Sequence, residues 1–247
     1  MKKMVVHYPP QMDYNCRESV NTIATNIIFS GNNLKRILFT SCTVSEGKTT
    51  MVMRIAMNMA ERGKKCVLVD MDLRRSMMVR RFGLSVEGGI KGISRYLTGQ
   101  CNMEDICYQT DIENLYIIPV DKNVNNPIPL INSDDFASLM ETLASEFDLV
   151  LVDTPPVGVV VDAADISAYC DASVMVIEYG KRHRHEAKNA VAQLQRVGTP
   201  VLGCIIDKVT VASLSEKQYY KSHYYYGHYG YGYYTEDGKK KKKGSDE

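Results

Sequence analysis

A short loop with the residue types of a phosphate-binding site follows the first long apolar run of the chain. Its residues are Ser45, Glu46, Gly47, Lys48, Thr49 and Thr50, and the pattern indicates a strand before the loop and a helix that begins within it. Backbone N–H groups at a helix start bind phosphate oxygens. We expect Lys48 to reach the terminal phosphates of a nucleotide and the Thr49 hydroxyl to ligate Mg²⁺. The first glycine usual in such a loop is replaced by Cys42.

Carboxylates follow two further apolar runs. Asp70 and Asp72 end the segment Val67-Leu68-Val69-Asp70-Met71-Asp72, and Asp153 ends the segment 148–153. Ligands of open α/β sheets bind beyond the carboxyl ends of the strands. Mg²⁺ prefers hard oxygen ligands such as these. Each aspartate alone could instead cap a helix or anchor a turn, but the three motifs together predict a magnesium-nucleotide site.

Tyrosines are concentrated near the C-terminus. Nine of the 16 tyrosines lie within residues 219–234. Their phenols could accept a phosphoryl group from the nucleotide site, although an aromatic low-complexity segment could also stack on partners or aggregate. The candidate phosphoacceptors are Tyr219, Tyr220, Tyr224, Tyr225, Tyr226, Tyr229, Tyr231, Tyr233 and Tyr234.

Short β-rich apolar runs alternate with helix-length segments over the first 200 or so residues, which is typical of a parallel sheet covered on both faces. A helix is predicted over Thr49 to Arg62 and a helical segment over residues 16–30. The fold class is therefore α/β, a P-loop protein with a doubly wound, mostly parallel sheet. The predicted strands are 37–40, 66–69, 115–119, 149–152, 173–177 and 201–206.

Composition limits the possible partners and compartment. The net charge of +1 predicts no nucleic-acid partner, and the seven scattered cysteines favour a reducing cytoplasm. No apolar run approaches the roughly 20 residues of a membrane helix, and the N-terminus lacks the apolar core of a signal peptide. We expect one domain over residues 1–212, followed by a flexible segment over 213–247.

These motifs resemble those of the bacterial tyrosine kinases (BY-kinases), in particular the cytoplasmic kinases of capsular and exopolysaccharide export systems. The resemblance extends from about Glu18 to the C-terminus. It rests on the loop ending at Thr49, Asp70-x-Asp72-x-Arg74-Arg75, Asp153-Thr154-Pro155-Pro156, Asn126-Pro127, Val161-Asp162-Ala163 and the tyrosine cluster. It implies a deviant Walker A branch of the P-loop fold, related to the partition and division-site ATPases.

The resemblance also implies the roles of individual residues. Lys48, Asp70, Asp72 and Asp153 would be catalytic, with ATP as the phosphoryl donor. Thr49, Asp70, Asp72 and Asp153 would hold Mg²⁺, and either Asp70 or Asp72 would accept the phenol proton. Asp207 would either accept a hydrogen bond from the adenine amino group or serve as a turn residue. Asp162 would either cap a helix or support the residues that line the site.

Two other functions compete with the kinase. A partition-type ATPase switch would carry a second lysine early in the loop, where this chain has Thr43. A nucleotide-binding scaffold would use the tail only to dock partners. The absence of the second lysine, together with Arg74, favours a kinase that phosphorylates its own C-terminal tyrosines.

The resemblance further implies partners and a location. These are a transmembrane adaptor of the polysaccharide chain-length-determinant class, a tyrosine phosphatase, and other copies of the chain, at the inner face of the cell membrane. The Glu-x-x-Arg-x-x-Arg pattern that builds ring oligomers in the family is not complete, because Asn21 and Ala24 stand at the two arginine positions. The formation of a ring is therefore left open.

Overall fold

The computed structural model describes residues 2–31, 33–181 and 184–209. They form the folded unit that ends at Lys208, together with Val209. The predicted division between residues 212 and 213 and the nine candidate phosphoacceptor tyrosines lie outside the described residues and stay predictions.

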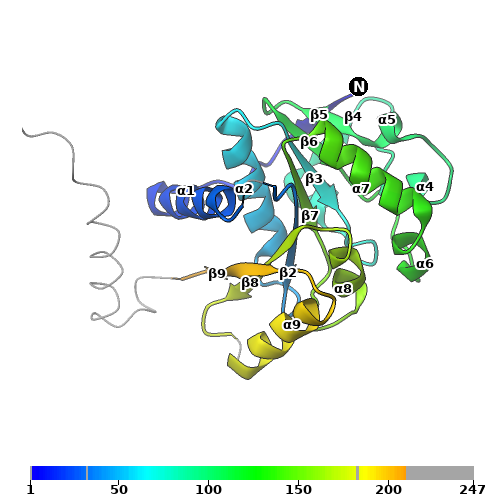
Figure 1. Cartoon of the computed structure of the whole chain (residues 1–247). Helices are drawn as coiled ribbons and strands as arrows, with labels where there is room; N and C mark the ends of the chain where they lie inside the picture. Colours follow the sequence, from blue (N-terminus) through cyan, green and yellow to red (C-terminus); the bar gives the residue numbers. More distant parts are fainter. Residues whose placement is uncertain (1, 32, 182–183, 210–247) are drawn as a thin grey trace, which may run out of the picture. The chain divides into compact units, whose positions relative to one another are not determined.

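One mixed sheet organises the described residues, with the strand order β4-β1-β5-β6-β3-β7-β2-β8-β9 (Figure 1). Six neighbouring strands, from β6 to β9 in this order, run parallel. They are the six strands predicted from the apolar runs, and the expected doubly wound fold is confirmed. Their bounds are β2 Arg36–Ser41, β3 Cys66–Asp70, β6 Leu115–Ile118, β7 Leu149–Asp153, β8 Ala172–Glu178 and β9 Val201–Asp207.

Three short strands that sequence patterns did not predict extend the sheet beyond β6. They are β1 (Lys3–Val6), β4 (Leu84–Val86) and β5 (Tyr108–Thr110). β5 pairs antiparallel with β6, β1 pairs parallel with β5, and β4 pairs antiparallel with β1. Strands of three or four residues are too short to show a recognisable alternation of apolar and polar side chains.

Helices cover both faces of the sheet (Figure 1). The predicted segment 16–30 is the helix α1, which starts earlier, at Tyr14, because the Asp13 side chain caps it by accepting from the N–H of Cys16 at 2.7 Å. In the described residues no helix is long and apolar enough to cross a membrane. The helices are α1 Tyr14–Phe29, α2 Lys48–Glu61, α3 Met78–Phe82, α4 Ile93–Tyr96, α5 Met103–Ile106, α6 Ile128–Ile131, α7 Asp134–Glu146, α8 Asp162–Ser167 and α9 Arg184–Arg196.

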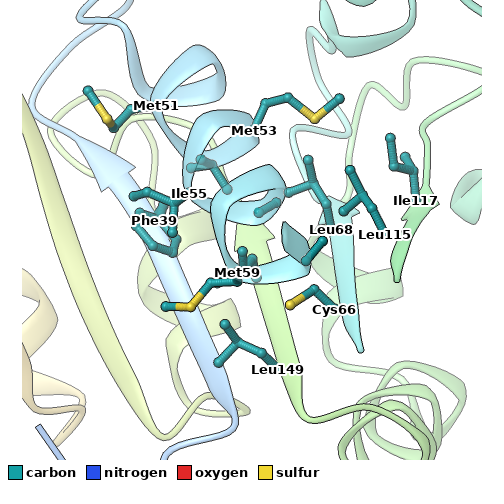
Figure 2. Close-up of a cluster of buried hydrophobic side chains, with 14 of the residues drawn as sticks. Phe39, Met51, Met53, Ile55, Met59, Cys66, Leu68, Leu115, Ile117 and Leu149 are labelled. Carbon is teal, nitrogen blue, oxygen red and sulfur yellow. The ribbon is translucent and has the colours of Figure 1, made fainter. Parts of the chain in front are cut away.

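The helix α2 anchors the phosphate loop to the core. Its methionine and isoleucine side chains pack on the sheet, where they meet Phe39 of β2 and Leu68 of β3 (Figure 2). Helices α7, α8 and α9 form a second apolar cluster on the opposite face. Full burial of one such side chain contributes about 1.5 to 3 kcal/mol. The start of α2, and with it Lys48, is therefore held firmly relative to β2 and β3.

Candidate active site

The strand order brings the predicted site residues to one edge of the sheet. The strand β7 lies between β2 and β3, so Asp153 pairs in register with Phe39 of β2 on one side and with Asp70 of β3 on the other. Since these strands are parallel, their carboxyl ends meet at the same edge. Asp70, Asp153 and the loop that follows β2 are neighbours there, as the sequence predicts.

The loop between β2 and α2 has an unusual backbone. Ser45 and Gly47 both have positive φ angles, 65° and 88°. A Cβ atom on Gly47 would lie 1.9 Å from Oδ2 of Asp207, so any other residue would be strained by the positive φ and would displace the Asp207 side chain. The carboxylate of Glu46 is buried and accepts from the backbone N–H of Thr43 at 2.9 Å, which closes the loop on itself.

Cys42 occupies the position of the missing first glycine, and it is buried in the apolar cluster beneath the loop. Its carbonyl oxygen faces Gly158, where an added Cβ would approach it to 2.3 Å. The loop accommodates Cys42 in place of glycine because the thiol is buried in the core. The residue that packs closely against the Cys42 carbonyl oxygen is itself a glycine, Gly158.

Lys48 lies at the first position of α2 and is almost fully buried. Its Nζ atom donates to Oδ1 of Asp153 and lies 3.4 Å from Oγ1 of Thr49. The structure therefore brings together the lysine, the hydroxyl and one carboxylate that the sequence predicts to handle phosphate and metal. Thr50 is turned to a different partner, because its hydroxyl accepts from Arg81 at 2.7 Å.

Asp70 is buried beside Asp153, and its two oxygens accept from the Ser76 hydroxyl and from the backbone N–H of Asp72, the latter at 3.1 Å. Burial, and next the charge of Asp153, raise the pKa of Asp70 to about 7. Burial also raises the pKa of Asp72, although the positive charge of Lys48 opposes this increase. Asp72 retains partial exposure to solvent, so the two carboxylates differ in accessibility.

Arg74 fixes the segment that follows Asp72. Its Nε and Nη2 atoms donate to the two carboxylate oxygens of buried Asp162 at 2.6 and 2.9 Å, and its Nη1 donates to the carbonyl oxygen of Asn125 at 3.3 Å. Asp162 lies in the first turn of α8, and Val161 precedes it as the cap residue. The sequence leaves open whether Asp162 caps a helix or supports the site. In the structure it supports the site through its ion pair with Arg74.

The end of β9 lies against the phosphate loop. Asp207 faces Gly47, and the Nζ atom of Lys208 donates at 2.9 Å both to the carbonyl oxygen of Ser45 and to Glu178. Sequence patterns singled out Asp207 but missed Lys208 and Ser76, since neither residue belongs to a recognisable motif. The contacts of Lys208 join residues that the strand order brings together, whereas Ser76 contacts Asp70, which lies six residues before it.

The donor set fits a divalent cation. Asp70, Asp72 and Asp153 bring more negative charge to this edge than Lys48 neutralises, and the charge of Asp153 adds to burial, the larger cause, in raising the pKa of Asp70. In the described residues no group of three or more His, Cys, Asp or Glu side chains forms a preformed metal cage. Mg²⁺ usually takes one or two protein carboxylates and fills its other positions with water and phosphate. The carboxylates and the Thr49 hydroxyl suit that mode of binding.

Comparisons with known proteins agree with this geometry. The model of an AAA domain family matches residues 36–197, so the folded unit is a nucleotide-binding P-loop domain. The tyrosine-protein kinase CpsD of Streptococcus agalactiae is 38% identical over 192 residues, which are 78% of this chain and 83% of CpsD. The chain belongs to the bacterial tyrosine-protein kinase family.

Solved structures place this bacterial tyrosine kinase in the same fold. The chimerical protein CapA2B2 superposes with a TM-score of 0.75 at 29% identity, covering 83% of this chain and 88% of CapA2B2. The kinase domain of the Escherichia coli tyrosine kinase ETK gives 0.73 at 25% identity, covering 79% and 78%. The septum site-determining protein MinD from Pyrococcus horikoshii, complexed with Mg-ADP, gives 0.61 at 22% identity over 74% of each chain, which shows a shared fold only.

Proposed function

We propose that this kinase transfers the terminal phosphoryl group of ATP to tyrosines of its own segment 219–234. The observation that carries the proposal is the convergence of Lys48, Asp70 and Asp153 on one sheet edge beside a phosphate loop. The resemblance to kinases with a C-terminal tyrosine cluster supports the choice of acceptor.

The chemistry follows from charge and access. The phenol oxygen forms a bond to the γ-phosphorus while the bond from that phosphorus to the β,γ-bridging oxygen breaks, and ADP leaves with the electron pair. Positioning and neutralisation of charge dominate such transfers. Lys48 supplies a fixed positive charge at the loop, and bound Mg²⁺ supplies further charge neutralisation.

We assign the late transfer of the phenol proton to Asp72. A phenol has a pKa near 10, so it is protonated as it approaches. Asp70 is enclosed by Ser76 and Asp153. Asp72 follows shortly after Asp70 in the chain and is partly exposed to solvent. Both carboxylates have raised pKa values, so accessibility, and not basicity, decides between them.

The wider role proposed here is regulation of capsular or extracellular polysaccharide synthesis and export. The resemblance supports recruitment to the inner face of the membrane by a transmembrane adaptor, transfer between copies of the chain, and reversal by a tyrosine phosphatase. Each phosphate adds about 1.5 to 2 negative charges. Phosphorylation of several tyrosines in one segment therefore weakens its docking and disassembles the complex.

The test is incubation of the full chain with ATP and Mg²⁺, followed by phosphosite mapping with mass spectrometry. Phosphotyrosine within 219–234 is expected for the wild type and for Lys64→Met, an exposed lysine near the end of α2. Lys48→Met is expected to remove it. Release of free phosphate without modified tyrosine would instead indicate an ATPase switch, and neither product would indicate a scaffold.

The proposed disassembly has its own measurement. Light scattering of the wild-type protein before and after phosphorylation is expected to show a decrease in mass. Equal masses in the two states would refute the idea that phosphorylation controls assembly, while leaving the kinase activity itself intact.

A further inference from the structure

A hollow lies beside the active-site carboxylates. It has a volume of about 300 Å³ and lies between the start of α3 and the segment that follows β6. Ser76 lines it, and the same Ser76 hydroxyl donates to Asp70. The hollow is therefore separated from the buried carboxylate of the site by one side chain.

The walls of this pocket combine apolar and polar groups. Val79 and Val120 contribute aliphatic surface, whereas Arg80, Asp121 and Asn123 contribute a cation, a carboxylate and an amide. The volume is at the lower end of the roughly 300 to 1,000 Å³ typical of ligand pockets, which are mostly apolar with a few polar groups that fix orientation. This composition suits a ring that has an apolar body and a polar tip.

The carboxylate of Asp121 in the pocket wall is held in place, but only one of its two oxygens has a hydrogen-bond partner. One oxygen of Asp121 accepts from Nε of Arg95 at 2.6 Å, while Oδ1 is buried without a hydrogen-bond partner. The backbone around it is anchored as well, since the N–H of Val124 donates to the carbonyl oxygen of Leu73 at 2.7 Å. The segment after β6 is thus tied directly to the residues that follow Asp72.

We infer that this pocket binds one tyrosine side chain of the segment 219–234 and thereby presents a neighbouring tyrosine to the Asp70–Asp72 edge. The inference rests on the proposed function, because it names the subsite that holds the acceptor segment. Val79 and Val120 would contact the ring, and the Arg80 guanidinium would lie near its face, an arrangement that favours aromatic ligands.

The spacing of the tyrosines supports this division of roles. In an extended chain, side chains two residues apart point to the same side and are separated by about 6.6 Å. The segment repeats this spacing at Tyr224 and Tyr226, and again at Tyr229, Tyr231 and Tyr233. One tyrosine of such a pair can fill the pocket while the other reacts, which gives a physical reason for a cluster in place of a single acceptor.

The test fills the pocket and measures binding without ATP. Asn123 is exposed and lines the hollow, so Asn123→Trp in the full chain places a large ring within it. Asn125→Trp, at an exposed position of the same segment that does not line the hollow, is the matched control. Fluorescence anisotropy of a labelled peptide of residues 219–234 is expected to show binding about tenfold weaker for Asn123→Trp and within about twofold of wild type for the control.

A second variant guards against a folding defect. Arg80→Ala removes an exposed side chain of α3, and we expect peptide binding about fivefold weaker together with an unchanged affinity for Mg-ADP. Equal peptide affinities for Asn123→Trp, Arg80→Ala and the control would overturn the inference. Failure of the proposed function has a different signature, namely that the wild type forms no phosphotyrosine at all, whatever the peptide affinities are.

Discussion

Replacing Asp70 by asparagine is expected to stabilise the protein at alkaline pH when Mg²⁺ is absent. The carboxyl group of Asp70 has its pKa raised to about 7 by burial and by the charge of Asp153, against 3.8 for an unperturbed aspartate. A raised folded-state pKa means that the folded protein binds the proton more tightly than the unfolded chain. The contribution of Asp70 to stability therefore falls as the pH rises from about 4 to about 7 and remains unfavourable above that range.

The size of the effect follows from the same linkage. Each pH unit between the two pKa values is equivalent to about 1.4 kcal/mol, so the variant should gain about 3 kcal/mol relative to wild type between pH 5 and pH 8. The hydrogen bond from Ser76 favours the ionised carboxylate and so lowers the pKa of Asp70, but this effect is already included in the net raised value.

Urea unfolding in the presence of EDTA measures this difference. Glu113→Gln, at an exposed position far from any strand end of the site, is the matched control and should show no comparable pH dependence. A difference between Asp70→Asn and wild type that stays constant from pH 5 to pH 8 would refute the electrostatic account of the site. Added Mg²⁺ is expected to stabilise the wild type more than the variant.

Three further substitutions test the loop, the ion pair and the core. Gly47→Ala places a methyl group 1.9 Å from Asp207 and is expected to weaken Mg-ADP binding at least about tenfold in a fluorescence titration; wild-type affinity would contradict the crowding between the loop and Asp207. Asp162→Asn breaks the bidentate pair with Arg74 and is expected to cost about 1 to 3 kcal/mol in urea unfolding. Met59→Ala leaves a cavity beneath α2 and is expected to cost about 2 to 5 kcal/mol by the same measurement, and a cost below about 1 kcal/mol would contradict its full burial.

Patterns in the sequence predict those parts of the fold that have long, regular elements. The six parallel strands and α2 are predictable from apolar runs and spacing because most of their apolar side chains are buried in the two clusters. The short strands at the far edge of the sheet escape prediction, since Lys3–Val6 is surrounded by polar residues and prolines. Its place in the sheet depends on pairing with residues about 80 to 105 positions away.

The site divides in the same way. Lys48, Asp70 and Asp153 can be predicted because each ends or begins an element next to a recognisable motif. Asp162 can be predicted only as a helix cap or a group behind the site, and its pairing with Arg74 cannot be predicted, because that contact joins residues 88 positions apart. The pocket beside Ser76 is equally hidden, since its lining residues come from three parts of the chain, namely 76–80, Ile90 and 120–123, that approach one another only in the folded chain.

The contact between Lys208 and the phosphate loop has a consequence for competition among substrates. Because the Lys208 amine holds the carbonyl oxygen of Ser45, the chain leaves the folded unit from the rim of its own nucleotide site. Under the proposed function, covalent attachment at that rim would make the local concentration of acceptor phenols depend on the length of the connection and not on the protein concentration. A tyrosine of another protein would then compete with an acceptor whose local concentration does not fall on dilution.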